Sequence, residues 1–358
     1  MTQDSHSPPA LPALGSVREA HRFDEGALAA YLTEHLPGFS GPLYVQQFES
    51  GQSNPTFLLE AGGARFVLRK KPPGKLLPSA HLVEREYRVM TALGATDVPV
   101  PRTRLLCEDA GVIGTAFYVM DYIEGRVIAD PALPGLSPAD RAATYDSMVH
   151  TLARLHAIDW RAIGLSDFGK PERYIERQVA RWTKQYEASR IRAIEGMDWL
   201  AAWLPAHVPE NDEATIAHGD FRLGNLMLHP TEPRVVAVLD WELSTVGHPL
   251  ADLAYNCLAY HMSSRAPGIR GVAGADLVAL GIPSEEDYVA AYAQRTGRSP
   301  GASFSFFLAF SLFRLGAIAE GVSARALQGN ASSESARDLA GVALMLADTG
   351  RRLAEGAR

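Results

Sequence analysis

The sequence predicts an α+β protein with two parts of different secondary structure. Between residues 43 and 125 it has five short runs rich in β-branched and aromatic residues, with one helical segment among them. From residue 137 onward the apolar residues recur mainly at helical spacing, and only two short runs resemble strands. We therefore expect a small antiparallel sheet lobe at residues 24–121 and a larger, mostly helical lobe at residues 122–358.

The elements of the small lobe follow one another in a simple order. Residues 1–23 have no signal-peptide pattern and are expected to form a flexible leader, followed by a helix over "FDEGALAAYLTEHL". The strands "LYVQQFE", "TFLLEA" and "RFVLRKK" are separated by turn segments and predict a three-strand meander. A helix is expected from Ser79 to Leu93, and "RTRLLCED" and "AFYVMDYIEG" add two strands.

Composition excludes several classes of protein. Hydrophobic residues make up 47% and charged residues 21%, as in soluble globular proteins, and the net charge of −7 disfavours nucleic acid or an anionic membrane as a partner. The two cysteines, Cys107 and Cys257, are too few for a disulfide framework, which fits a cytoplasmic protein. The apolar run "FSFFLAFSLFRLGAIA" contains Arg314, so we expect a buried helix and no membrane span.

Three polar residues lie around the two strand-like runs of the second part of the sequence, and their spacing is informative. Asn225 follows Asp220 by five positions, and Asp240 ends the apolar run "VVAVL". A phosphoryl-transfer centre of the protein-kinase type needs an Asp to orient the substrate hydroxyl, an Asn five residues later for Mg²⁺, and a strand-end Asp for the metal. The order and spacing match. Phosphoryl transfer needs these residue types because it depends on positioning and on charge neutralisation by oxygen ligands.

Other interpretations of this segment are weaker. Asp220 taken alone fits a turn carboxylate, and His218, Asp220 and His229 could be ligands of a transition metal. The metal alternative leaves Asn225 and Asp240 without roles. We interpret His218 as a structural histidine that holds the loop by a backbone hydrogen bond.

The small lobe supplies candidates for binding phosphates. The turn after the first strand can offer backbone N–H groups and hydroxyls, and its candidate residues are Ser50, Gly51, Ser53 and Asn54. On "FVLRKK" the strand alternation places Arg69 and Lys70 on opposite faces, so either cation could point at a nucleotide. Glu86 on the next helix is the expected acidic partner. A plain hairpin turn and a solvated helix face are the alternatives.

These motifs together resemble the aminoglycoside phosphotransferase and choline-kinase-like family, which has a two-lobed protein-kinase-like fold. The sequence has "HGDFRLGN" and "LDWE" where the family has H-G-D-x-x-x-x-N and D-[FW]-E, and the resemblance runs from about Leu43 to Tyr255. It implies ATP and Mg²⁺ as cofactors and a hydroxylated small molecule as substrate. It also implies a role for each matching residue: Asp220 is catalytic, Asn225 and Asp240 bind the metal, Asp252 braces the catalytic loop, and Glu242 is a further acid near the metal.

The resemblance also assigns residues of the small lobe. Arg69 occupies the position where the family often has lysine, with Glu86 as its partner and Lys70 as the alternative. Arginine keeps its charge and can clamp phosphates with a forked head. The backbone of Met120, Asp121, Tyr122 and Ile123 would face the adenine. Arg222 is a candidate to meet either the transferred phosphoryl group or an anionic substrate.

A narrower resemblance concerns the substrate. Segments such as "VLRKKPPGKLLPSAHLVEREYRVM" are similar to the kinase-like domains fused to, or encoded beside, acyl-CoA dehydrogenases. This similarity implies phosphorylation of hydroxyacyl-CoA thioesters, particularly 4-hydroxyacyl-CoAs. The basic and aromatic segment "GKPERYIERQVARWTKQYEASRIR" favours an anionic ligand over a polycation, although a solvated amphipathic helix has the same pattern. An aminoglycoside or choline-type kinase and a regulatory pseudokinase are the alternative functions.

Overall fold

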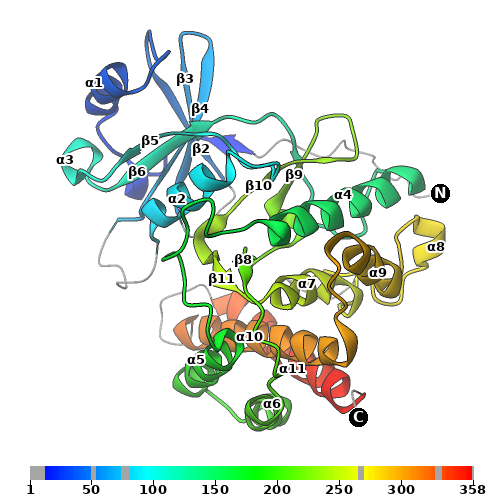
Figure 1. Ribbon diagram of the computed structural model, residues 1–358. Helices are drawn as coiled ribbons and strands as arrows, with labels where there is room; N and C mark the ends of the chain where they lie inside the picture. Colours follow the sequence, from blue (N-terminus) through cyan, green and yellow to red (C-terminus); the bar gives the residue numbers. More distant parts are fainter. Residues whose placement is uncertain (1–12, 50–53, 74–80, 265–269, 327–332, 357–358) are drawn as a thin grey trace, which may run out of the picture. The chain divides into compact units, whose positions relative to one another are not determined.

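The computed structural model describes residues 13–49, 54–73, 81–264, 270–326 and 333–356. Its contacts divide the chain into two compact units (Figure 1). The first consists of residues 1–128, 163–165 and 224–244, and the second of residues 129–162, 166–223 and 245–358. The first unit thus contains the expected sheet lobe together with residues 224–244, a segment that comes much later in the chain.

An antiparallel sheet of six strands forms the first unit, in the order β1-β2-β3-β4-β6-β5. The strands are β1 (Leu14–Gly15), β2 (Tyr44–Phe48), β3 (Thr56–Ala61), β4 (Ala64–Lys70), β5 (Thr103–Cys107) and β6 (Phe117–Asp121). The last five correspond to the five expected strands. β1 lies within the segment that we expected to be a flexible leader, where a two-residue strand is too short to show a period of two. Residues 1–12 of that leader lie outside the described residues.

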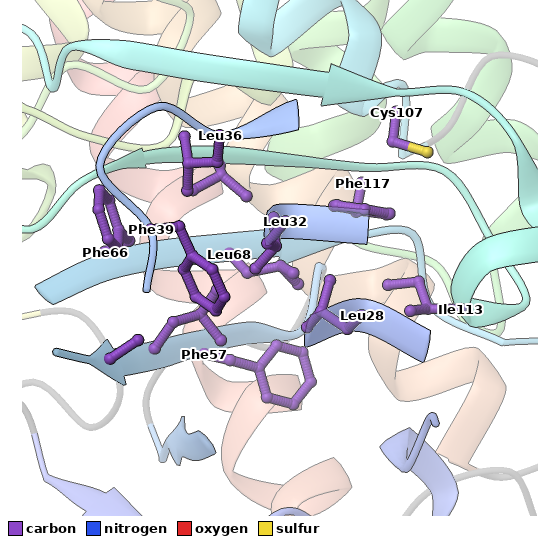
Figure 2. Packing of buried hydrophobic residues seen from close by; sticks show 13 residues of the cluster. Leu28, Leu32, Leu36, Phe39, Phe57, Phe66, Leu68, Cys107, Ile113 and Phe117 are labelled. Atoms are coloured by element: carbon purple, nitrogen blue, oxygen red, sulfur yellow. The ribbon is translucent and has the colours of Figure 1, made fainter. Parts of the chain in front are cut away.

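A hydrophobic core fills one side of this sheet. Helix α1 (Glu25–His35), capped by Asp24, buries Leu28 and Leu32 against Phe57, Leu68 and other core residues (Figure 2). Helix α3 (Ala110–Ile113) adds Ile113 to the same cluster. Helix α2 (Val83–Leu93) begins later than expected, and Ser79, the expected cap, lies outside the described residues. Because Glu86 is buried with the apolar face of α2, this helix can hold a carboxylate in a fixed position.

Residues 224–244 form a small structure of their own. Strands β10 (Val235–Val238) and β9 (Leu226–Leu228) pair antiparallel, and β9 also pairs with β7 (Arg126–Val127). The 3₁₀ turns η2 (Leu223–Asn225) and η3 (Trp241–Leu243) flank the two longer strands. The two strand-like runs of the second half of the sequence therefore form a hairpin, and the candidate metal ligands Asn225 and Asp240 both lie at the end opposite its turn.

The second unit is mostly helical, as expected. Its helices are α4 (Pro138–Ala157), α5 (Tyr174–Ser189), α6 (Glu195–Ala206), α7 (Pro249–Cys257), α8 (Leu277–Leu280), α9 (Glu285–Thr296), α10 (Phe304–Arg325) and α11 (Ser333–Gly356), with short 3₁₀ turns η4 (Leu258–Tyr260) and η5 (Gly301–Ser303). Strands β8 (Thr215–Ala217) and β11 (Thr245–Gly247) pair antiparallel and were not expected, because three residues carry almost no pattern.

Helix α10 is the central helix of the second unit. It packs against α5, α6, α7 and α11 (Figure 1). Among the described residues, the segment 301–325 is the one helix long and apolar enough to cross a membrane, but 61% of its most apolar window is buried inside the protein. Its apolar residues therefore have protein neighbours, in agreement with the expected buried helix.

Two glycines at helix ends provide a matched test of the packing. Gly281 and Gly297 follow α8 and α9 with φ of 72° and 71°, but a Cβ at Gly281 would lie 2.2 Å from the backbone oxygen of Pro138, whereas one at Gly297 meets nothing within 4 Å. We expect Gly297→Ala to lower the free energy of unfolding by about 1 kcal/mol, the cost of a left-handed alanine. Gly281→Ala should cost about 2 kcal/mol more, because backbone must move. Equal losses in urea unfolding would contradict the close approach.

Candidate active site

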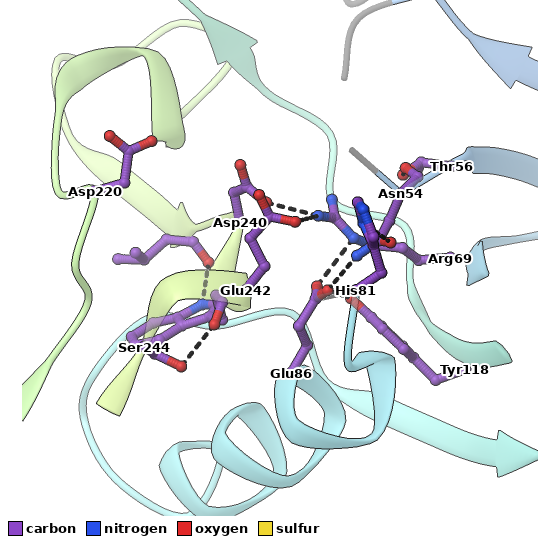
Figure 3. Close-up of polar contacts among 12 residues, drawn as sticks. Asn54, Thr56, Arg69, His81, Glu86, Tyr118, Asp220, Asp240, Glu242 and Ser244 are labelled. Carbon is purple, nitrogen blue, oxygen red and sulfur yellow. Dashed lines mark hydrogen bonds and ion pairs between the residues drawn. The ribbon is translucent and has the colours of Figure 1, made fainter. Parts of the chain in front are cut away.

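Arg69 lies at the centre of a cluster of acidic side chains in the first unit (Figure 3). Its Nη2 donates to Oδ1 of Asp240 at 2.6 Å and is 3.8 Å from Oε2 of Glu242. Its Nε is 2.9 Å from Oε2 of Glu86, close enough for an ion pair although the N–H is not aligned for a hydrogen bond. One guanidinium thus connects β4 with α2 and with the segment after β10.

The neighbouring cation has a different environment. Lys70 is buried on the opposite face of β4, with its Nζ 5.5 Å from the centre of the Phe23 ring, and burial lowers its pKa. The two acids in the first turn of α2, Glu84 and Glu86, have different partners, because Glu84 pairs with Lys71 at 2.9 Å. The structure therefore brings Arg69 and Glu86 into the acidic cluster and leaves Lys70 and Glu84 outside it.

Glu86 is held from several sides. Its side chain is 1% exposed; Nδ2 of Asn54 donates to one carboxylate oxygen at 2.7 Å, and the Tyr118 hydroxyl donates to the other at 3.1 Å. Nδ1 of His81 is 3.1 Å from Oδ1 of Asn54. The amide of Asn54 is thus committed to Glu86, a contact that the expected phosphate-binding turn did not include. Ser50, Gly51 and Ser53, the other residues of that turn, lie outside the described residues.

Sequence reasoning missed both Tyr118 and His81. Tyr118 is the cross-strand partner of Arg69 in the pairing of β4 with β6, so the strand register contains a signal for it. His81 has a φ of 60°, and nothing in the sequence marks it as a neighbour of Asn54.

The cluster carries more negative than positive charge. Burial is the main cause that raises the pKa of Glu86 to about 7; the charge of Arg69 opposes this rise, and the charges of Asp240 and Glu242 add to it. Burial alone would lower the pKa of Arg69, but the surrounding negative charges, with Glu86 first among them, together outweigh burial and raise it. Three carboxylates around one guanidinium are electrostatically suited to an additional cation.

The predicted metal ligands lie on adjacent segments. Asp240 follows β10 with a φ of 64°, a left-handed conformation that Asp adopts more readily than most residues. The N–H of Leu239 donates to the backbone oxygen of Asn225 at 2.8 Å, and Asn225 is 6% exposed. Their oxygen donors and the surplus negative charge fit Mg²⁺, which usually takes one or two protein carboxylates together with substrate phosphates.

Nothing supports the alternative metal site. In the described part of the chain no three His, Cys, Asp or Glu side chains form a group that could hold a metal ion. Nδ1 of the buried His218 accepts the backbone N–H of Asp220 at 3.2 Å, so it is engaged in the loop that it was expected to hold.

Asp252 fixes the loop that contains Asp220. In the second unit the carboxylate of Asp252 accepts the N–H of His218 at 2.6 Å and that of Gly219 at 2.8 Å. Nε2 of His156 lies 3.4 Å from the same carboxylate. Burial would raise the pKa of Asp252, but these hydrogen bonds and the neighbouring histidines outweigh burial and lower it. Gly219 has a φ of 83°, which a glycine adopts without strain.

The Asp220 carboxylate remains partly accessible. Its side chain is 16% exposed, and Nε of Arg222 lies 3.3 Å from Oδ2. The Tyr255 hydroxyl is within hydrogen-bonding reach of the same carboxylate. Asp220 is therefore held in place while part of it can still meet a substrate.

The segment predicted to face adenine begins within β6, which ends at Asp121, and continues beyond the strand to Ile123. The Asp121 carboxylate is bound by Arg104 at 2.6 and 2.9 Å, and the Arg65 guanidinium lies 4.4 Å from the centre of the Tyr122 ring. Met120 is buried. The N–H of Asp121 donates to the backbone oxygen of Arg102 at 2.9 Å, so the backbone that follows the strand, at Tyr122 and Ile123, is what this segment can offer to a base.

The raised pKa of Glu86 leads to a prediction about stability. Between pH 4.5, the usual value, and about 7 the folded chain holds a proton that the unfolded chain has lost, so the free energy of unfolding falls as pH rises. Glu86→Gln has no such proton. Its free energy of unfolding relative to wild type should therefore rise between about pH 5 and about pH 8, by up to about 3 kcal/mol. Urea unfolding measures it, with Glu84→Gln on the same helix as control; parallel curves for both variants would contradict the shift.

The chain is similar to known phosphotransferases. Residues 45–293 match the phosphotransferase enzyme family. A crystal structure of a candidate aminoglycoside phosphotransferase from Ralstonia eutropha is 51% identical, with a TM-score of 0.86, over 94% of this chain and 100% of that one. A choline kinase from Cryptosporidium parvum shares the fold at 15% identity, with a TM-score of 0.59 and coverage of 93% and 97%.

Curated relatives are longer proteins. Acyl-CoA dehydrogenase family member 11 of Rattus norvegicus is 48% identical over 93% of this chain and 43% of its own length. Acyl-CoA dehydrogenase family member 10 of Mus musculus is 48% identical over 91% of this chain and 31% of its own length. The chain thus spans less than half the length of these relatives. With the family match covering most of the sequence and the fold of its solved relatives, the chain belongs to the phosphotransferase enzyme family.

Proposed function

We propose that this chain is an ATP-dependent kinase that transfers the γ-phosphoryl group to the hydroxyl of a small molecule, with a hydroxyacyl-CoA as the acceptor. The observation that carries the proposal is the Arg69 cluster, in which Glu86 and Asp240 fix one guanidinium. Kinases use a cation held by a helix carboxylate to position the nucleotide phosphates. The accessible Asp220 on a braced loop supports transfer as well as binding.

The first unit supplies the nucleotide-binding groups. Arg69 clamps the α- and β-phosphates, and its position is preset by the ion pair with Glu86. The backbone from Met120 to Ile123 meets the adenine. Asn225 and Asp240 hold Mg²⁺, which when bound neutralises charge on the phosphates. Glu242, 3.8 Å from Arg69, adds negative charge beside that metal position.

The second unit supplies the group that orients the acceptor. Asp220 accepts a hydrogen bond from the acceptor hydroxyl and aims its oxygen at the γ-phosphorus. The two backbone N–H groups bound to Asp252 keep the loop from shifting during transfer. Arg222, paired with Asp220 at 3.3 Å, can turn to a phosphoryl oxygen or to an anionic acceptor.

Two findings support the choice of acceptor. The longer relatives are named acyl-CoA dehydrogenases, so a CoA thioester is a reasonable common substrate for both parts of such a protein. The basic α5 segment of the second unit suits an anionic ligand. A cytoplasmic location and a functional link to an acyl-CoA dehydrogenase belong to the same proposal.

Turnover with a panel of acceptors tests the function. We expect ADP release with Mg-ATP and a 4-hydroxyacyl-CoA to exceed release with an aminoglycoside or choline at the same concentration. Turnover with an aminoglycoside or choline, and none with the 4-hydroxyacyl-CoA, would contradict the proposed acceptor but support the kinase activity. Nucleotide binding without turnover on any hydroxylated compound would favour a regulatory pseudokinase and reject the enzyme.

Two matched carboxylate substitutions separate the roles of the site residues. Asp220→Asn should lower kcat by about three orders of magnitude or more and spare Mg-ATP affinity, because the lost carboxylate orients only the acceptor. Asp240→Asn should instead weaken Mg-ATP binding about tenfold or more, since it removes a charged metal ligand. Calorimetric titration with Mg-ATP and initial rates distinguish them. Unchanged turnover in Asp220→Asn would refute the orienting role.

A further inference from the structure

Three arginines of the second unit lack acidic partners. They are Arg177 and Arg181 on α5 and Arg314 on α10, and within the described residues none of them forms an ion pair. Other arginines in and beside α5 are paired with acids: Arg173 with Glu176, Arg190 with Asp198, and Arg192 with Glu320. Arg177 and Arg181 are four positions apart on α5 and so share a face, and Arg314 lies beside the same helix, 5.4 Å from the centre of the Trp182 ring. The charges of all three also lower the pKa of Tyr174 on this helix, against the effect of burial.

Arg314 is the most deeply placed of the three. Its guanidinium carbon lies 5.4 Å from the centres of both the Trp182 and Tyr255 rings. Its Nε is buried and has no hydrogen-bond partner among the described residues. An unsatisfied buried donor on a charged group costs free energy that the two rings offset only in part. A group that can accept from Arg314 would remove this cost.

The position of Arg314 connects it to the catalytic loop. Tyr255 lies between them: Arg314 is over its ring, and its hydroxyl is within reach of the Asp220 carboxylate. Burial and the charge of Asp220 raise the pKa of Tyr255, and the charge of Arg314 opposes this shift. Arg314 is thus separated by one aromatic side chain from the residue that aims the acceptor hydroxyl.

We propose that Arg314, with Arg177 and Arg181, forms an anion-binding subsite that holds a negatively charged group of the acceptor. This inference rests on the proposed kinase function and extends it to substrate class. Three clustered cations repel a polycationic acceptor such as an aminoglycoside and attract one with a phosphate or carboxylate. Trp182 and Tyr255 hold the Arg314 fork in one orientation, which suits a planar or tetrahedral oxyanion.

Binding without turnover tests the subsite. We expect Arg314→Met to weaken the binding of a 4-hydroxyacyl-CoA about tenfold or more, with unchanged Mg-ATP affinity, because an uncharged chain of similar length cannot pair with the anion. Arg325→Met removes the same charge from an exposed position on the same helix and should leave both affinities unchanged. The hydroxyacyl-pantetheine and the free hydroxy acid identify the anion: loss of binding with the first points to the nucleotide phosphates, and tight binding of the second to a carboxylate.

Further variants distinguish loss of the subsite from misfolding of a single variant. Arg181→Met lies on an exposed position of α5 and should also weaken binding, while Arg314→Lys should recover part of it. Equal affinities of wild type, Arg314→Met and Arg181→Met, or no binding of any anionic acceptor to wild type, would overturn the subsite. The acceptor titration contains no ATP and therefore does not depend on phosphoryl transfer. Binding of these anions without any turnover would contradict the kinase proposal but still support the subsite.

Discussion

The ion pairs of Arg69 are the interaction on which the first unit depends. They join a strand of the sheet, a helix and a hairpin contributed by residues far along the chain. Breaking a buried ion pair by removing one partner typically costs about 3–5 kcal/mol, because the remaining charge is left without compensation. The same pairs present the guanidinium in a defined orientation. The stability of the unit and the defined position of the Arg69 guanidinium therefore have a common origin.

The cluster also explains how arginine can serve at a position where the family resemblance leads one to expect lysine. A lysine has one nitrogen at the end of its chain, whereas Arg69 meets Glu86 through Nε and Asp240 through Nη2 at the same time. Its charge persists beside three carboxylates and in a buried environment. Asn54 and Tyr118 donate hydrogen bonds to the two carboxylate oxygens of Glu86. The carboxylate that pairs with Arg69 is therefore itself held in place.

In the second unit a buried carboxylate also holds a functional segment in place, here through hydrogen bonds to the backbone. One buried carboxylate, Asp252, accepts two successive backbone N–H groups and so fixes the loop that carries Asp220. Beyond it, His156 joins Asp252 to the Tyr292 hydroxyl on α9, 2.7 Å from the histidine Nδ1. The loop that contains Asp220 is thus tied to the helical core by a continuous buried network, which restricts its motion.

Local patterns in the sequence were enough to predict most elements of the fold and the spacing of the polar motifs. Strand alternation and helical spacing are local properties, so five strands, the long helices and the order Asp220, Asn225 and Asp240 could be predicted. Two-residue and three-residue strands such as β1 and β8 could not, since so few residues carry no periodicity.

Which side chains meet could be seen only in the folded chain. Strand alternation left Arg69 and Lys70 equivalent, and the acids that select Arg69 come from a helix and a hairpin that are distant in sequence. The partners Tyr118 and His81, and the placement of Arg314 between Trp182 and Tyr255, likewise depend on packing between separate elements. Contacts of this kind arise from the fold as a whole, so no local pattern in the chain records them.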